Sequence, residues 1–127
     1  MKISVAMATY NGAQYIEEQL ESIRIQTMPV DEVRICDDGS SDDTVEVICH
    51  YIREHGLESS WSVEVNHENL GYASNFMKAV GLTNGDYVFF CDQDDIWIAD
   101  RAERMIGLME AHPDICLLYT SVAADEE

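Results

Sequence analysis

Basic residues are scarce in this chain of 127 residues: 7 Lys and Arg stand against 25 Asp and Glu, for a formal net charge of −18. A chain this acidic repels nucleic acid and anionic membrane surfaces, which excludes both as direct partners. An anionic ligand can bind only with local help from a metal ion or from backbone N–H groups. The charge is spread along the sequence and 46% of the residues are hydrophobic, which is typical of a globular domain.

Several other signatures are absent. The chain has no Gly-x-Ser-x-Gly elbow and no Gly-x-x-x-x-Gly-Lys phosphate loop. Its four cysteines form no Cys-x-x-Cys pair, so we expect buried free thiols in a reducing compartment rather than a zinc or redox site. No stretch approaches a membrane span, and the apolar N-terminus is too short for a signal peptide. These absences favour a cytoplasmic protein, with association at the inner face of the membrane, through a partner or a missing segment, left open.

Hydrophobic periodicity predicts strands that alternate with helices. Short apolar runs predict strands at 2–9, 32–36, 61–65, 86–91 and 115–119. The segments between them carry apolar residues at helical spacing. Alternation of this kind predicts an α/β fold, with a mostly parallel sheet covered by helices on both faces. The length suits one domain over residues 1–127.

The predicted helices each present one apolar face. Ser40 or Ser41 is expected to cap the second helix, and Gly56 to close it. Met28-Pro29 and His112-Pro113 end the first and fourth helices. In chain order, the residues expected to be buried are Ile16, Leu20, Ile23; Val45, Ile48, Cys49, Ile52; Ala73, Phe76, Met77, Val80; and Ala102, Met105, Ile106, Met109.

The most informative stretch runs from residue 87 to 97. Five apolar residues, expected to form a buried central strand, lead directly into Asp92, Asp94 and Asp95. Carboxylates this close resist joint ionisation unless a cation lies between them. Asp and Gln oxygens suit Mg²⁺ or Mn²⁺, so we expect a metal site here, with a solvated acidic turn as the alternative. Trp97 either packs on the end of the sheet or lines a sugar pocket.

Polar clusters follow three of the predicted strands, at residues 9–11, 37–40 and 92–95. Right-handed crossovers place the carboxyl ends of parallel strands on one edge, where ligands bind in such folds. We therefore expect the three clusters to form one site.

Each cluster offers a different chemistry. Tyr10 offers an aromatic face on which a base can stack, or else packs on the first helix. Asp37 or Asp38 can accept a hydrogen bond from a pyrimidine ring N–H, or else cap a helix. Asp92 would reach a ribose or the metal, and Asp94 would bind the metal that bridges a diphosphate.

Assembled in this order, the motifs resemble the N-terminal half of family 2 glycosyltransferases, which have the Rossmann-like GT-A fold. The match covers about residues 2–120, and 91–97 is similar to a subgroup that includes bacterial rhamnosyltransferases. The pieces are Ala8-Thr9-Tyr10-Asn11-Gly12, Asp37-Asp38-Gly39-Ser40-Ser41-Asp42-Asp43-Thr44, Asn69-Leu70-Gly71 with Asn75, and Asp92-Gln93-Asp94-Asp95, which contains an Asp-x-Asp (DXD) motif.

The resemblance implies a role for each site residue. Tyr10 and Asp38 would contact the base, with help from the backbone near Ala8 and Thr9. Asp92 would contact the ribose or the metal. Asp94 would bind Mn²⁺ or Mg²⁺. In place of the arginine that family members often carry before the asparagine of the third helix, this chain has Ser74.

The resemblance also implies a reaction, which is inverting transfer from a UDP- or dTDP-sugar to a saccharide or lipid-linked saccharide in polysaccharide biosynthesis. Uracil and thymine present the same hydrogen-bonding edge, so the two donors are not separable here. The catalytic base and the acceptor-binding part are expected beyond Glu127, so that the GT-A fold would be truncated. A nucleotide-binding module without turnover is the alternative, and homo-oligomer formation stays open.

Overall fold

The computed structural model describes residues 2–92 and 95–112, in which four strands alternate with four helices. The expected strand at 115–119 lies outside the described residues. The elements are β1 (Ile3–Thr9), α1 (Ile16–Arg24), β2 (Glu32–Asp37), α2 (Thr44–Glu54), β3 (Trp61–Val65), α3 (Tyr72–Gly81), β4 (Tyr87–Cys91) and α4 (Arg101–Ala111).

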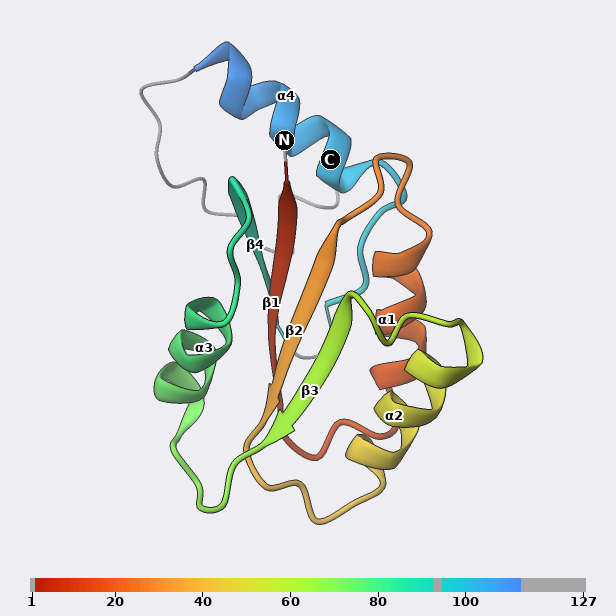
Figure 1. Cartoon of the computed structure of the whole chain (residues 1–127), viewed down its shortest axis with the longest axis vertical. Helices are drawn as coiled ribbons and strands as arrows, with labels where there is room; N and C mark the ends of the chain where they lie inside the picture. The colour runs from red at the N-terminus through yellow and green to blue at the C-terminus, as the bar shows by residue number, and fades with distance from the viewer. Residues whose placement is uncertain (1, 93–94, 113–127) are drawn as a thin grey trace.

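The described strands form one parallel sheet in the order β3-β2-β1-β4 (Figure 1). Thr9 at the end of β1 lies opposite Asp37 at the end of β2, and Asp37 lies opposite Val65 at the end of β3. The chain runs from β1 to β2 and β3 on one side of β1 and then crosses to β4 on the other side, so the switch point where ligands bind in such sheets lies between β1 and β4. The predicted parallel sheet and shared edge are confirmed.

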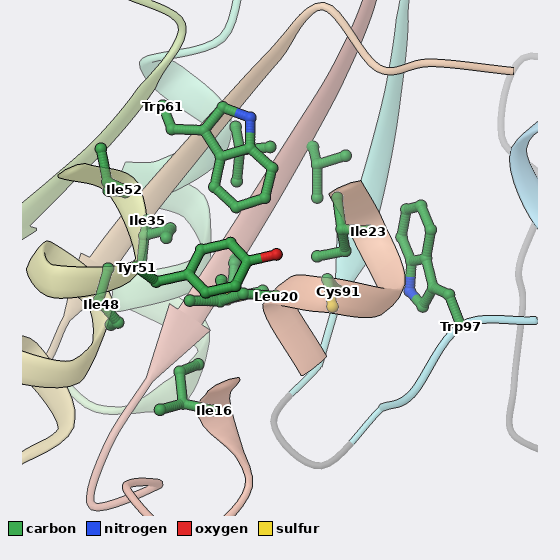
Figure 2. Packing of buried hydrophobic residues seen from close by; sticks show 13 residues of the cluster. Ile16, Leu20, Ile23, Ile35, Ile48, Tyr51, Ile52, Trp61, Cys91 and Trp97 are labelled. Carbon is green, nitrogen blue, oxygen red and sulfur yellow. The ribbon is translucent and has the colours of Figure 1, made fainter. Parts of the chain in front are cut away.

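Helices cover both faces of the sheet, as predicted: α1 and α2 lie on one face and α3 on the other (Figure 1). Alternate residues of a strand point to opposite faces. Val5 and Met7 of β1 therefore pack under α1 and α2, in the larger cluster shown in Figure 2, whereas Ala6 and Ala8 pack with Phe76 under α3. The small alanines leave room for that ring.

The predicted helix faces are confirmed for α1 and only in part elsewhere. Ile16, Leu20 and Ile23 are buried, but Ala73 and Met77 of α3 are exposed. Ala79, which is not among the residues expected to be buried, lies in the core. The helix instead turns Asn75 inward with Phe76 and Ala79, because the Asn75 amide donates a 2.8 Å hydrogen bond to Cys36 O.

The remaining faces follow the expected positions. Ile48 and Ile52 of α2 and Ala102 and Ile106 of α4 are buried, and the other expected positions on these two helices are partly buried. Gly56 follows α2 with a φ of 64°, a conformation that favours glycine and closes the helix as predicted.

The strand predicted at 86–91 is confirmed as β4, but it is less buried than expected. Within the described residues β4 pairs with β1 alone and lies at an edge of the sheet, and Phe90 is 45% exposed. An apolar run reports which faces of a strand are apolar, but not how many strands lie beside it.

The described part of the chain includes no helix that is long and apolar enough to cross a bilayer. The thiols of Cys36 and Cys91 are free and buried, as predicted, and burial raises the pKa of both above the ordinary value. Cys49 is free and partly buried, and Cys116 lies outside the described residues.

Gly85, just before β4, provides a test of the strand pairing. A Cβ at this position would lie 3.0 Å from the backbone N of Ser4 and closer still to its Oγ. We expect Gly85→Ala to lower the free energy of unfolding by about 1–3 kcal/mol, as overpacking does in well-packed interiors. Urea unfolding measures the loss. Gly107→Ala, where a Cβ meets nothing within 4 Å, is the control, and equal stability of the two variants would contradict this packing.

Candidate functional site

The loops after β1 and β2 are hydrogen-bonded to each other. Asn11 has a φ of 51°, donates its backbone N–H to Ser40 Oγ at 2.8 Å and accepts the Ser41 N–H on its Oδ1 at 2.8 Å. Gly12 N donates to Thr44 Oγ1 at 2.9 Å. These bonds explain why the turn signal after the first strand and the Ser-rich turn after the second occur together: each loop fixes the other.

Asp37 organises the second of these loops from inside. Its carboxylate is fully buried and accepts hydrogen bonds from Thr9 Oγ1 at 2.7 Å and Gly39 N at 3.1 Å. It also accepts both the N–H and the hydroxyl of Ser40, at 2.7 and 2.6 Å. Asp37 therefore holds the ends of β1 and β2 together.

The prediction that Ser40 or Ser41 caps the second helix is wrong. The helix begins at Thr44, with Asp43 at the N-cap position and no side-chain bond from it. Ser40 is instead bonded to Asp37, and the Thr44 N–H is accepted by Asp42 Oδ1 at 3.0 Å. A run of Ser and Asp offers several capping residues, and the pairing with Asp37 decides among them.

Asp38 is buried and bonded to the loop that follows β3. Its Oδ1 accepts hydrogen bonds from Leu70 N at 2.7 Å and Asn66 Nδ2 at 2.9 Å, and its Oδ2 accepts the Gly71 N–H at 3.0 Å. Burial opposes ionisation of this carboxyl, but the three donors outweigh it and hold the pKa of Asp38 below its ordinary value. Asp38 is thus a fixed, ionised acceptor.

Two side chains that the sequence reading did not single out as donors, Asn66 and Lys78, complete this network. The Asn66 amide donates to Asn75 Oδ1 at 2.7 Å as well as to Asp38, and its Oδ1 accepts from Lys78 Nζ at 2.7 Å. Asn66 could have been predicted as a site residue from its position directly after a strand, a position that Asp38 also has. Lys78 brings a positive charge into this network one helical turn after Ser74.

A pocket of about 340 Å³ opens at this edge of the sheet. Four of the predicted residues line it together: Ala8, Thr9, Tyr10 and Asp38. The other lining residues come from the β3–α3 loop and α3, and they are Asn69, Gly71, Tyr72 and Asn75. Asp37 and Asp92 are not among the lining residues, so of the two adjacent aspartates Asp38 is the one that faces the pocket.

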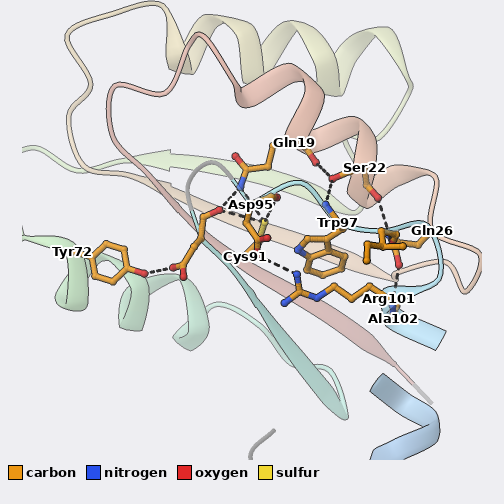
Figure 3. Close-up of polar contacts among 11 residues, drawn as sticks. Gln19, Ser22, Gln26, Tyr72, Cys91, Asp95, Trp97, Arg101 and Ala102 are labelled. Carbon is orange, nitrogen blue, oxygen red and sulfur yellow. Dashed lines mark hydrogen bonds and ion pairs between the residues drawn. The ribbon is translucent and has the colours of Figure 1, made fainter. Parts of the chain in front are cut away.

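Asp92 lies beside the pocket rather than in its wall. Its carboxylate is exposed at the end of β4 and its Oδ1 accepts the hydroxyl of Tyr72, a pocket residue (Figure 3). Asp94 lies outside the described residues. Within the described ranges no three His, Cys, Asp or Glu side chains are close enough to hold a metal, but an exposed carboxylate oxygen at this position fits the chemistry of a hard divalent ion.

Trp97 packs in the core and does not line the pocket. Its indole is buried, and its ring centroid lies 5.6 Å from that of Phe89. The Arg101 guanidinium lies over the same ring, 4.7 Å from its centroid. The first of the two alternatives for this residue is therefore correct.

Comparison with known proteins gives one consistent result. The sequence pattern described as "Glycosyl transferase family 2" matches residues 4–127. The "dTDP-rhamnosyl transferase RfbG" of Shigella flexneri is 40% identical over 107 residues, which are 81% of this chain and 36% of the relative. The match covers 36% to 41% of the length of three curated relatives, so this chain spans about two fifths of each.

Solved structures agree in fold. Staphylococcus aureus TarS 1-349 in complex with UDP is 29% identical, with a TM-score of 0.76 over 89% of this chain and 33% of that chain. The mannosyltransferase PcManGT from Pyrobaculum calidifontis, in complex with GDP-Man and Mn²⁺, is 30% identical, with a TM-score of 0.71 over 77% of this chain and 29% of that chain.

Proposed function

Because the chain belongs to glycosyl transferase family 2, we propose that the pocket beside Asp38 binds the nucleotide of a nucleoside-diphosphate sugar donor. The fold is the expected α/β fold of GT-A type. The observation that carries the proposal is the convergence of β1, the β2–α2 loop and α3 on one pocket that has Tyr10 and the ionised Asp38 in its wall.

The pocket suits a pyrimidine base. Tyr10 is 45% exposed and lines the pocket, and stacking of a base on such a ring contributes about 1–3 kcal/mol. Asp38, held ionised, would accept the ring N–H that both uracil and thymine carry. The solved TarS complex contains UDP, and the relative RfbG is named a dTDP-rhamnosyl transferase. A UDP- or dTDP-sugar is therefore the proposed donor class.

A divalent ion is proposed to accompany the diphosphate, with Asp92 and Asp94 as its protein ligands. Mn²⁺ or Mg²⁺ would offset the charge of the departing nucleoside diphosphate, as a chain with a net charge of −18 requires. The PcManGT structure contains Mn²⁺ together with GDP-Man. In this chain, Asp38 and Tyr10 would contact the base and ribose and hold them in the pocket. The sugar would then be presented outside the pocket.

We propose that the complete reaction is inverting transfer of the sugar to a hydroxyl of a saccharide or lipid-linked saccharide, in the cytoplasm. A module that binds nucleotide without turnover would use the same pocket, and an assay for sugar transfer or donor hydrolysis separates the two functions.

Asp94 gives the test of the metal proposal. Calorimetric titration of UDP and dTDP should show tighter binding with Mn²⁺ than without it. Asp94→Ala is expected to remove that gain, by at least about tenfold in Kd, or about 1.4 kcal/mol. Asp100→Ala, which removes the half-exposed carboxylate that pairs with Arg104, is the matched control. Unchanged metal dependence in Asp94→Ala would exclude Asp94 as a ligand.

A further inference from the structure

Lys78 of α3 is linked to the pocket through the side chain of Asn66. Its ammonium donates a 2.7 Å hydrogen bond to Asn66 Oδ1, and Lys78 itself is not among the residues that line the pocket. Asn66 directly follows β3 and is 6% exposed. Its Nδ2 donates to Asp38 Oδ1 at 2.9 Å and to Asn75 Oδ1 at 2.7 Å. Both acceptors belong to residues that line the pocket, so this buried amide lies between a cation and the pocket wall.

The partners of Asn66 fix which end of its amide faces Asp38. An ammonium group can only donate hydrogen bonds, and an ionised carboxylate can only accept them. If the amide were turned by 180°, its NH2 group would face the Lys78 ammonium and its oxygen would face the Asp38 carboxylate, and neither contact could form a hydrogen bond. Asn75 favours the same orientation, because its own Nδ2 donates to Cys36 O at 2.8 Å and its Oδ1 accepts from Asn66. Lys78 therefore stabilises the orientation in which Asn66 donates to Asp38.

A second contact of Lys78 is too exposed to explain its position. The ammonium lies 3.8 Å from Glu64 Oε1, and the two side chains are 37% and 48% exposed. Ion pairs this exposed contribute little to stability. The bond to Asn66 is shorter and is made to a buried acceptor, and hydrogen bonds from charged donors are among the stronger ones. The contact with Asn66 is therefore the one that matters for the pocket.

Asn66 supplies one of the three donors that hold the Asp38 carboxylate. The other two are backbone N–H groups: that of Leu70 also binds Oδ1, and that of Gly71 binds Oδ2. A carboxylate oxygen can accept two hydrogen bonds, so Oδ2 can accept a ring N–H of a base in addition to the Gly71 N–H. The bond from Asn66 to Oδ1 helps to set the direction in which Oδ2 is presented.

We propose that Lys78 is a positioning residue for the nucleotide site: it orients the Asn66 amide, and Asn66 holds Asp38 as the acceptor that recognises the base. The inference rests on the proposed function and adds to it a residue outside the pocket that contributes to base specificity. A fixed carboxylate accepts the ring N–H of uracil or thymine, whereas the corresponding ring nitrogen of cytosine carries no hydrogen and is itself an acceptor. Loss of Lys78 should therefore weaken binding of UDP more than binding of CDP.

Titrations of the full chain with three ligands test the inference. The ligands are UDP, CDP and uridine, which carries the base and ribose without the diphosphate. The variants are Lys78→Met, Lys78→Arg, Asn66→Ala and the double variant with Lys78→Met and Asn66→Ala. Two controls are Arg53→Met, which removes an exposed positive charge from α2, and Glu64→Gln, which removes the carboxylate near Lys78. Each Kd is measured at a temperature where near-ultraviolet circular dichroism shows the variant folded.

Lys78→Met is expected to weaken binding of UDP and of uridine by the same factor, about tenfold, and binding of CDP by less than about threefold. Lys78→Arg should keep the Kd for UDP within about threefold, because a guanidinium can also donate to the Asn66 oxygen. In the Asn66→Ala background, Lys78→Met should add less than about twofold, because it acts through Asn66. Both controls should stay within about twofold of the unsubstituted chain.

Four results would overturn the inference. Unchanged binding of UDP by Lys78→Met would show that the contact has no consequence for the pocket. A loss confined to UDP, with uridine unaffected, would show that Lys78 acts on the charge of the diphosphate and not through Asp38. An equal loss for UDP and CDP would exclude a role in base specificity. A tenfold effect of Lys78→Met in the Asn66→Ala background would show that Lys78 does not act through Asn66.

The test survives the two ways in which it can be complicated. If Asn66→Ala does not fold, the comparison of the three ligands in Lys78→Met and the rescue by Lys78→Arg decide the question. Failure of the proposed function reads differently from failure of the inference: the unsubstituted chain would then bind neither UDP nor uridine, and the inference would fall with it.

Discussion

Asp38→Ala is expected to abolish detectable nucleotide binding, with a loss of at least about 100-fold in affinity, and to lower the free energy of unfolding by about 3 kcal/mol. The carboxylate is the acceptor for three donors: Leu70 N, Gly71 N and the Asn66 amide. Alanine leaves all three donors without this acceptor, although water from the pocket can accept some of these hydrogen bonds instead. The loop that carries Asn69 and Tyr72 into the pocket wall would then lose its attachment to β2.

Asp38→Asn separates the two effects. The amide keeps the size of the side chain and can still accept on one oxygen, so the loss of stability should be smaller than in Asp38→Ala. Asp43→Ala, an exposed position in the same loop, controls for the removal of one negative charge. Calorimetry measures UDP binding and urea unfolding measures stability. Binding of UDP by Asp38→Ala within about twofold of the unsubstituted chain would contradict the place of Asp38 in the site.

The second large effect is expected at Glu32, at the end of the sheet where the parallel strands begin, opposite the pocket. Glu32 is buried at the start of β2, where it accepts from Ser4 Oγ at 2.5 Å and Asn84 N at 2.8 Å and pairs with Arg34 at 3.0 Å. Glu32→Ala should lower the free energy of unfolding by about 3 kcal/mol, since it removes the acceptor of the buried Ser4 hydroxyl and of the Asn84 N–H and leaves the partly buried Arg34 without its carboxylate. That is a large share of the roughly 5–15 kcal/mol of a typical domain.

Glu32→Ala should nevertheless leave the pocket intact in the molecules that remain folded. Urea unfolding gives the loss of stability. The Kd for UDP, calculated from the concentration of folded chain, should stay within about twofold of the value for the unsubstituted chain. Glu18→Ala, an exposed carboxylate on α1, is the control for charge. Equal stability of the two variants would show that the buried cluster contributes nothing.

The same carboxylate predicts a pH dependence. Burial alone raises the pKa of Glu32, but the Ser4 hydroxyl, the Asn84 N–H and the charges of Arg34 and Lys2 outweigh it and lower that pKa in the folded chain. A lowered folded pKa gives stability that is complete above the ordinary value of 4.5 and is lost as pH falls through the folded value. The stability difference between the unsubstituted chain and Glu32→Ala should therefore narrow below about pH 4.5. A constant difference down to pH 3 would contradict this.

Much of the fold could be predicted because it depends on local pattern. Apolar residues three and four apart place Ile16, Leu20 and Ile23 on one face of α1, and alternating strands and helices dictate a parallel sheet with a common edge. The gathering of Tyr10 and Asp38 at one pocket follows from that edge alone.

What sequence reasoning missed depends on contacts between distant segments. Nothing in the local sequence distinguishes Asp37 from Asp38. In the structure, Asp37 accepts a hydrogen bond from the Thr9 hydroxyl, whereas Asp38 accepts one from Leu70 N in the β3–α3 loop. Asn75 could be placed on the inner face of α3 only by knowing that Cys36 O lies there to accept its amide. Arg101 would be assigned to an exposed helix face by its charge, whereas contact with the Trp97 ring and with the partly buried Asp95 carboxylate makes its burial favourable.

The most direct test of the account is a calorimetric titration of UDP into the unsubstituted chain with and without Mn²⁺, with dTDP as a second ligand and ADP as a control for the base. The account predicts saturable binding of one pyrimidine nucleotide per chain that is tightened by Mn²⁺, with ADP binding at least about tenfold more weakly. No binding of UDP or dTDP in either condition would contradict the donor site. The family membership would then describe the ancestry and fold of this chain and not a ligand that it binds.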